Sequence, residues 1–259
     1  MAVATLRIRF ESESVAGRFF ETRPRFLHVD RPEKDTLLVT GSVRAWREHC
    51  LGHPGTKVAK AAAAFLARHQ PLLFGDLVPK RGAIQPEGVA VEKVPLPEVD
   101  ALPADLLGKH RHLGVRFIVN RAVTHEIVRH RPCSFLQESQ RYCRYADDRF
   151  GNEVTFIAPL FFAEGSPEYT LWAQSMAASE ASYLRLLATT SPQAARTVLP
   201  NSCKTELIVY CNLLEWLHIL KLRTSAAAEP SMREIMIPLL AVLRERFPGV
   251  FGALPVPAV

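Results

Sequence analysis

One short segment of the sequence concentrates basic side chains beside hydroxyl groups and thiols. The stretch VRHRPCSFLQESQRYCRY, residues 128–145, contains Arg129, His130, Arg131, Arg141 and Arg144 against a single carboxylate, Glu138. One guanidinium group can bind two phosphate oxygens at once. A hydroxyl such as that of Ser139 and the amides of the loop can donate further hydrogen bonds to the same phosphate. The segment therefore predicts a site for one small phosphorylated molecule. The alternative is that these arginines pair with carboxylates of the chain itself, namely Glu126, Glu138, Asp147 and Asp148.

Two other kinds of chemistry fit the segment poorly. A zinc helix needs His-Glu-x-x-His, but in THEIVRH Arg129 occupies the last position and His130 follows it, about 140° round the helix from His125. Ser134 and Ser139 lack the neighbouring glycine of a hydrolase nucleophile elbow. We therefore expect neither a bound metal nor a Ser-His-Asp hydrolase.

Nucleic acid is a further possible ligand, because aromatic rings at Phe135, Tyr142 and Tyr145 alternate with the arginines and bases stack on such rings. Extended binding also needs a basic stripe, and the rest of the sequence mixes its charges. The net charge of +6 agrees with a protein that handles anions. The composition argues against nucleic acid as the main partner.

Cysteine usage and apolar runs predict a cytoplasmic protein that does not cross a membrane. The five cysteines form no CxxC pair, which argues against a disulfide framework and a zinc ribbon, and we expect them to be buried as small hydrophobic residues. Arg7 and Arg9 interrupt the start of the chain where a secretory signal needs an apolar core. The apolar run 207–222 contains Glu215 and Lys221, so it does not resemble a membrane span.

Hydrophobic periodicity predicts the elements that position the segment. Residues up to about 42 are predicted as strands, and helices follow over 43–50 and 57–69, the second with Thr56 as its N-cap. The prolines between residues 78 and 103 predict a long surface connection. With 259 residues, of which 48% are hydrophobic, we expect one domain over 1–259.

The second half of the chain has clearer signals. Alternation predicts a strand over 115–119, and a helix should then run from Thr124 to about Arg131, where Pro132 stops it. Further predicted elements are a long helix over 168–188, a short one over 194–198, a strand over 205–211, a helix from Asn212 through Lys221, and a last helix over 232–246 kinked at Pro238. The arginines thus lie at a helix end and in the loop after it.

A signature and the motifs on either side of it resemble those of the flavin-dependent thymidylate synthases. Arg129-His130-Arg131, then seven residues, then Ser139, resembles the RHR-x7-S signature of that family. FIVNRAVTHEIVRHR precedes it, and AARTVLP, Asn212 with Trp216 and His218, and Leu222-Arg223 follow in the family's order. The resemblance covers residues 110–240, a family-like catalytic core, and leaves 1–100 as a divergent N-terminal part.

The resemblance implies an α/β (α+β) fold with a central, mostly antiparallel sheet flanked by helices, and a homotetramer with shared active sites. It implies methylation of dUMP to dTMP, with methylenetetrahydrofolate as the carbon donor and NADPH-reduced FAD as the hydride donor. A non-catalytic nucleotide- or RNA-binding protein on the same fold is the alternative, and a bound flavin would distinguish the two.

The resemblance also implies roles for single residues. Cofactor-binding positions are Arg129, His130, Arg131, Asn212 and His218. Substrate-binding positions are Glu126, Arg129, Gln137, Glu138, Ser139, Gln140, Arg141, Arg196 and Arg223. Arg223 matches the catalytic position, where a fixed cation stabilises negative charge on the uracil ring. Cys133 and Cys143 lie beside the signature, but we expect neither to be a nucleophile.

Overall fold

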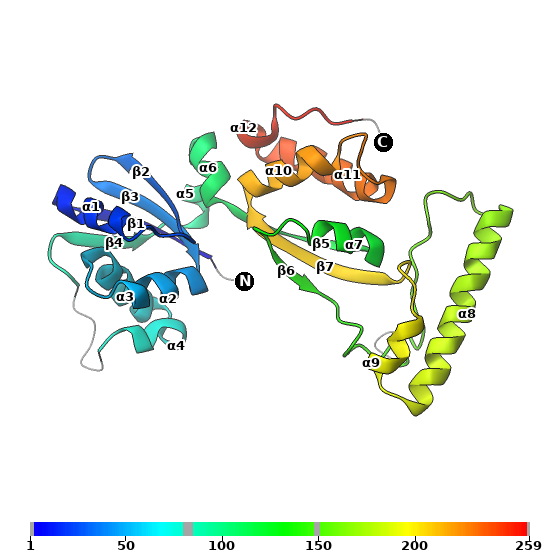
Figure 1. Ribbon diagram of the computed structural model, residues 1–259. Helices are drawn as coiled ribbons and strands as arrows, with labels where there is room; N and C mark the ends of the chain where they lie inside the picture. The colour runs from blue at the N-terminus through cyan, green and yellow to red at the C-terminus, as the bar shows by residue number, and fades with distance from the viewer. Residues whose placement is uncertain (1–2, 80–84, 148–150, 258–259) are drawn as a thin grey trace. The chain divides into compact units, whose positions relative to one another are not determined.

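The chain forms two compact units, residues 1–112 and 113–259, and each contains its own β-sheet (Figure 1). The computed structural model describes residues 3–79, 85–147 and 151–257. Antiparallel strands flanked by helices confirm the predicted α/β (α+β) fold class. The single domain expected from the chain length stays a prediction, and the two units are treated separately below.

The first unit is built on a four-stranded antiparallel sheet with strand order β2-β3-β1-β4. Its strands are β1 (Val3–Phe10), β2 (His28–Glu33), β3 (Thr36–Ser42) and β4 (Val89–Lys93). Its helices are α1 (Glu13–Glu21), α2 (Val43–Gly52), α3 (Lys57–His69), α4 (Pro71–Phe74), a 3-10 turn (Gly75–Leu77), α5 (Leu96–Asp100) and α6 (Ala104–His110).

Strand β3 is buried on both faces, which explains its continuous apolar run. Leu37 and Val39 pack into the main core with residues of α1, α2 and α3. Leu38 points to the opposite face and packs with Val94 and Val99. Successive side chains of a strand alternate between faces, so a central strand covered on both sides needs apolar residues at every position.

Helices α2 and α3 confirm the sequence prediction, including the Thr56 cap of α3, and the structure adds a Ser42 cap for α2. The Ser42 hydroxyl accepts from the Ala45 amide at 3.1 Å, and the Thr56 hydroxyl accepts from the Ala59 amide at 3.3 Å. These caps satisfy backbone donors that the first helical turn leaves without partners. Local side-chain chemistry therefore sets where both helices begin.

Two predictions for the first unit were wrong. Residues 13–21 form helix α1 rather than strand, because Val15, Ala16 and Phe19 share one helical face that packs into the core. The stretch expected as a surface connection contains β4, which pairs with β1, and the short helix α5. Pro95 is the N-cap of α5, and Pro97 lies in its first turn. Backbone N–H groups at these positions have no partner within the helix, so proline, which lacks this group, is tolerated there.

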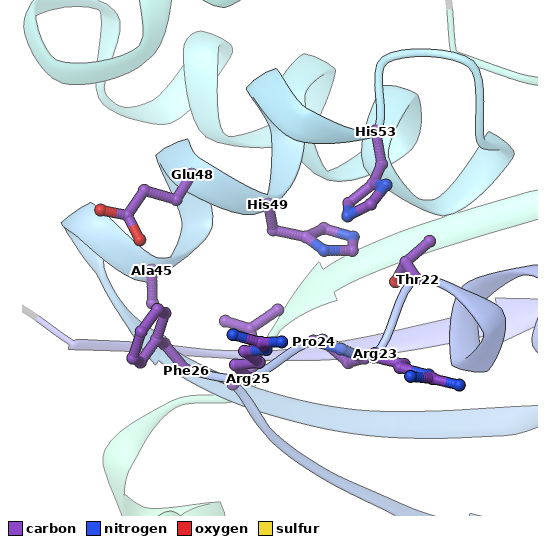
Figure 2. Close-up of a pocket in the computed structure, with 10 residues that line it drawn as sticks. Thr22, Arg23, Pro24, Arg25, Phe26, Ala45, Glu48, His49 and His53 are labelled. Atoms are coloured by element: carbon purple, nitrogen blue, oxygen red, sulfur yellow. The ribbon is translucent and has the colours of Figure 1, made fainter.

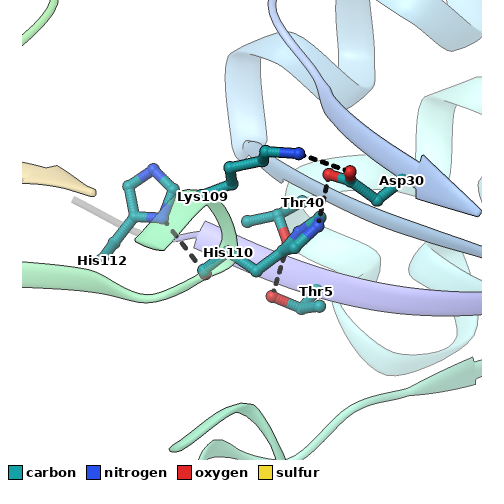
Figure 3. A network of polar contacts seen from close by, with 6 residues as sticks. All are labelled: Thr5, Asp30, Thr40, Lys109, His110 and His112. Carbon is teal, nitrogen blue, oxygen red and sulfur yellow. Dashed lines mark hydrogen bonds and ion pairs between the residues drawn. The ribbon is translucent and has the colours of Figure 1, made fainter. Parts of the chain in front are cut away.

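A buried chain of polar contacts crosses the first unit (Figure 3). The hydroxyls of Thr5 and Thr40 lie 2.8 Å apart, and the Thr40 hydroxyl lies 2.8 Å from Nδ1 of His110. The opposite nitrogen of His110 lies 3.1 Å from Asp30, which also accepts from Lys109 at 2.6 Å. The network ties α6 to β1, β2 and β3, so the end of this unit is anchored to its sheet.

The second unit is built on a three-stranded sheet with strand order β5-β7-β6. Its strands are β5 (His112–Asn120), β6 (Ser134–Gln137) and β7 (Lys204–Asn212). Its helices are α7 (Arg121–Ile127), α8 (Pro167–Thr189), α9 (Pro192–Ala195), a 3-10 turn (Arg196–Val198), α10 (Leu213–Arg223), α11 (Pro230–Arg246) and α12 (Pro248–Phe251). No helix within the described residues is long and apolar enough to cross a membrane.

The predicted strands over 115–119 and 205–211 and the predicted helices after residue 167 are confirmed within one or two residues at most ends. In β7, Thr205, Leu207 and Val209 are buried and alternate with less buried residues, as a sheet with one covered face requires. Trp216 of α10 is fully buried and donates from its ring N–H to the Leu113 carbonyl at 3.1 Å. This contact attaches α10 to the start of β5.

Helix α7 begins and ends earlier than predicted. Asn120 rather than Thr124 precedes the helix, and its side-chain oxygen accepts from the Val123 amide at 2.9 Å. The helix ends at Ile127 because the ring of Pro132 would collide with the carbonyl of a helical Val128. Arg129, His130 and Arg131 therefore lie in irregular backbone between α7 and β6, which gives their side chains directions that one helical face would not.

The buried histidine of the Thr5–Thr40–His110 network predicts a pH-dependent stability. Burial lowers the pKa of His110, and Asp30 offsets only part of that effect. A histidine with a depressed folded pKa stabilises the fold above its unfolded pKa of about 6.5, and this contribution is lost as pH falls below that value. We expect His110→Gln to lose less free energy of unfolding than the unmodified chain between pH 7.5 and 5.5.

Urea unfolding of the full chain at the two pH values measures this difference. His69→Gln is the matched control, since His69 is exposed on α3, and it should keep the full pH dependence. An unchanged pH dependence in His110→Gln would show that this histidine does not couple protonation to folding.

Candidate functional site

The predicted catalytic arginine lies at the centre of a polar cluster at the ends of α7 and α10. Arg223 donates from Nη1 to a Glu126 carboxylate oxygen at 2.7 Å and from Nη2 to the Glu126 carbonyl at 3.1 Å. Its Nε donates to Nε2 of His130 at 3.1 Å. The structure thus brings together three predicted site residues that are far apart in the sequence.

Glu215 and His218, one helical turn apart on α10, border the same cluster. Nδ1 of His130 lies 4.0 Å from the Glu215 carboxylate, and the rings of His130 and His218 meet edge to face at 5.9 Å between centroids. Asn212 caps α10 through its side-chain oxygen, which accepts from the Glu215 amide at 2.8 Å. The predicted flavin-side residues His130, Asn212 and His218 therefore share one region. Glu215 is an addition that the sequence analysis used only as a capping signal.

The electrostatic state of His130 follows from its surroundings. Burial, then the positive charges of Arg223 and His218, lower the pKa of His130 to about 4. Burial also raises the pKa of Glu215. Because Nε2 of a neutral His130 accepts from Arg223, its proton must lie on Nδ1, directed at Glu215.

The same three groups have the composition of a metal site. Ligand atoms of His130, Glu215 and His218 all lie within 4.8 Å of one another. A metal there would need an unprotonated Nδ1 on His130, and the neighbouring Arg223 already carries a positive charge. The arrangement therefore favours a neutral hydrogen-bonding histidine over a cation ligand.

A second group of predicted residues follows β6 and is fixed mainly by neutral partners. The Gln137 amide donates to the Thr124 hydroxyl at 3.0 Å. Glu138 accepts from the Tyr145 hydroxyl at 2.8 Å and lies 3.4 Å from the ammonium of Lys204. Tyr145 and Lys204 were not predicted as site residues. Their contacts with Glu138 become visible only in the folded chain, where β6 pairs with β7.

Most arginines of the signature have no carboxylate partner among the described residues. Arg223 pairs with Glu126, and Arg144 lies 3.8 Å from Asp147. Asp148, the other carboxylate considered in the sequence, lies outside the described residues. In contrast, no side-chain hydrogen bond or ion pair with any residue that the structure describes is formed by Arg129, Arg131 or Arg196. The Arg141 side chain donates to the neutral amide of Gln193 at 3.2 Å. Self-pairing therefore accounts for two arginines and leaves four without carboxylates.

Two buried donors near this group also have no partner within the described part of the chain. They are Nε2 of Gln140, a predicted substrate residue, and Nη1 of Arg121, at the start of α7. Ser139 accepts weakly from the Arg141 amide at 3.4 Å. A buried donor without an acceptor costs about 1–3 kcal/mol, so both groups favour an acceptor that comes from a ligand. The sequence analysis missed Arg121, because one arginine after a capping asparagine has no distinctive local signal.

The aromatic residues of the segment do not form a stacking platform. Tyr145 is buried in a core with Tyr183 and Leu187, whereas Tyr142 is 72% exposed with the Arg141 guanidinium 5.4 Å from its ring centre. Stacked nucleic acid needs several exposed rings along a groove. This arrangement argues further for a compact ligand.

All five cysteines are free, as expected, and Cys133 is buried while Cys143 is half-buried. Contact with the Cys133 thiol and burial both raise the pKa of Cys211. Cys133 therefore lies against another core thiol, an environment that suits a packed side chain rather than a reactive thiolate.

The site defines an α/β protein with a group of arginines that lack carboxylate partners among the described residues, as an anion site requires. Residues 108–249, more than half of the chain, match the family Thy1, thymidylate synthase complementing protein. The chain belongs to this family. It is 31% identical over 160 residues to the flavin-dependent thymidylate synthase of Mycobacterium avium (strain 104), covering 54% of this chain and 62% of that protein.

Two further relatives carry the same name. The protein from Mycobacterium tuberculosis (strain ATCC 25177 / H37Ra) is 30% identical over 54% of this chain and 62% of its own length. The protein from Corynebacterium glutamicum is 30% identical over 52% of this chain and 58% of its own length. The match thus spans about three fifths of each curated relative and leaves most of the first unit unmatched.

The contact between Arg223 and His130 generates a prediction about titration. Replacing Arg223 by Gln removes a positive charge, so the pKa of His130 should rise from about 4, while burial still keeps it below the ordinary value of about 6.5. Arg223→Lys keeps a charge in place and should leave the pKa closer to that of the unmodified protein. Imidazole carbon-bound proton shifts followed by NMR against pH measure both. An identical midpoint for His130 in the Gln variant would contradict the assignment.

Proposed function

We propose that this chain is the subunit of a cytoplasmic flavin-dependent thymidylate synthase. In this proposal it methylates dUMP to dTMP, with methylenetetrahydrofolate as carbon donor and NADPH-reduced FAD as hydride donor. The observation that carries the proposal is the set of arginines without carboxylate partners, Arg129, Arg131, Arg141 and Arg196, inside the family match. The names of the relatives supply the reaction class.

The nucleotide phosphate is the ligand that best fits the group after β6. Arg141 and Arg196 supply guanidinium groups, and Ser139 and the buried amide of Gln140 supply further donors. Charge-assisted bonds of this kind are about twice as strong as neutral ones. Gln137 is held through its amide by Thr124, which leaves its carbonyl oxygen to accept from the substrate.

Arg223 is proposed to act on the uracil ring. Methylation at C5 builds negative charge on N3 and the ring carbonyls, and a fixed cation in a site with little water stabilises it. Glu126 holds Arg223 in position by a 2.7 Å ion pair, and the Arg223 side chain is 18% exposed. The Arg223 charge is therefore oriented before substrate arrives, and Arg129 is proposed to contact the nucleotide from the adjoining loop.

The flavin-side residues are proposed to be Arg129, His130, Arg131, Asn212 and His218. When bound, FAD supplies the hydride chemistry, so the protein needs only to bind and orient it. The exposed Arg129 and Arg131 suit a diphosphate, and a neutral His130 suits hydrogen bonding with a ring.

A homotetramer is also proposed, supported by helix α8. Of its 23 residues only Tyr183 and Leu187 are buried, and Leu171 is 65% exposed. A helix of this length normally owes its stability to a packed apolar face, so α8 is suited to pack against other copies of the chain.

The proposed function is tested by flavin binding and turnover of the purified chain. We expect FAD to copurify or bind on addition, and dTMP to form from dUMP when NADPH and methylenetetrahydrofolate are present. Arg196→Gln should weaken dUMP binding by about ten- to a hundredfold while FAD affinity is kept, because it removes charge-assisted contacts to the phosphate.

Arg246→Gln, at the end of α11, is the matched control and should behave as the unmodified chain. Absorbance and fluorescence titrations measure FAD, and calorimetry measures dUMP. A flavin spectrum unchanged at saturating FAD would refute the proposed function. Unmodified dUMP affinity in Arg196→Gln would refute only the role of that residue.

We further predict that no cysteine acts as nucleophile. Cys133→Ala and Cys143→Ala, alone and combined, should lower dTMP formation by less than about tenfold, under 1.4 kcal/mol of barrier. The reason is that Cys133 packs against Cys211 and an arginine-polarised uracil needs no thiolate. A loss of about a thousandfold or more in a variant that still binds FAD and dUMP would point to covalent catalysis.

A further inference from the structure

A cavity in the first unit has the features of a second ligand site. It lies between the end of α2 and the segment Thr22–Leu27 and has a volume of about 220 Å³. His49 and His53 lie on one side of it, with Pro24 and Arg25 opposite them (Figure 2). All residues that line the cavity precede the family match, which begins at residue 108.

His49 is the first observation that points to a ligand. The residue is 6% exposed, and its Nε2 has no hydrogen-bond partner among the described residues. Its ring meets Phe19 at 5.2 Å edge to face and His53 at 5.2 Å, both measured between ring centroids. Neither ring is a hydrogen-bond partner for this nitrogen, so an occupant of the cavity that His49 lines is a candidate partner.

The charges around the cavity determine which ligand suits it. Arg23 and Arg25 line it and form no ion pair or side-chain hydrogen bond with residues that the structure describes. The only carboxylate in the lining, Glu48, is paired with Arg44 at 2.6 Å. The remaining charge is positive, which disfavours a metal cation and favours an anion.

We propose that this cavity binds a small molecule through a phosphate, sulfate or carboxylate group, held by Nε2 of His49 and the guanidinium of Arg25. His53 stands beside His49 and adds a second imidazole donor. The proposal goes beyond the proposed synthase function, because it assigns a separate anion site to the unmatched part of the chain.

Protonation should be coupled to binding at this site. Burial, followed by the nearby His53, lowers the pKa of His49 to about 4, so His49 is neutral at pH 7 without ligand. Glu48, the carboxylate among the lining residues, is paired with Arg44. A bound anion supplies the missing opposite charge and favours imidazolium. The affinity for the anion should therefore rise as pH falls.

Sulfate is a suitable probe because its charge is constant between pH 5.5 and 7.5. We expect sulfate titrated into the full chain to shift the NMR signals of the His49 and His53 rings, with His49→Gln used only to assign the signal. The dissociation constant should fall between pH 7.5 and 5.5. Arg25→Gln should raise it by roughly tenfold or more, because Arg25 is exposed and its loss removes a ligand contact rather than packing.

Arg68→Gln, another exposed arginine of this unit, is the matched control and should bind sulfate as the unmodified chain does. Parallel titrations with inorganic phosphate and acetate distinguish a phosphoryl ligand from a carboxylate one. Equal shifts with chloride at the same ionic strength, no shift with any of the three anions, or an unchanged dissociation constant in Arg25→Gln would each overturn the proposal.

Discussion

The three contacts of Arg223 are the interaction on which the candidate site depends. The Arg223 side chain is 18% exposed, and a charge that is largely removed from water needs a partner. Glu126 provides both a carboxylate and a carbonyl oxygen for it. The third contact fixes the ring of His130 and its tautomer. The end of α10 is thereby attached to the end of α7, and the basic loop that follows α7 begins from a fixed point.

The carboxylates near the site already pair with other groups, so the remaining arginines are available to a ligand. Glu126 is used by Arg223, Glu138 by Lys204 and Tyr145, and Asp147 by Arg144. Arg129, Arg131 and Arg196 therefore keep their positive charge unneutralised among the described residues. In the proposed function, a phosphate would supply the negative charge that these arginines lack in the empty protein.

The first unit handles its polar groups differently. Its buried histidines are kept neutral by burial, as the lowered pKa values of His49, His110 and His112 indicate. His110 has partners on both ring nitrogens and stabilises the fold, whereas Nε2 of His49, a residue that lines a cavity, has no partner among the described residues. The difference between a satisfied and an unsatisfied imidazole separates a structural role from a proposed binding role.

The sequence by itself determined the features that depend on near neighbours. Capping side chains at Ser42, Thr56 and Asn212 and the alternation in β7 specify local structure, and the RHR-x7-S spacing specified the family. Only the tertiary structure decided which arginines are neutralised, that Tyr145 and Lys204 hold Glu138, and that His49 and Arg25 line one cavity. The reason is that ion pairing and burial depend on which distant segments meet, and local periodicity contains no information about those partners.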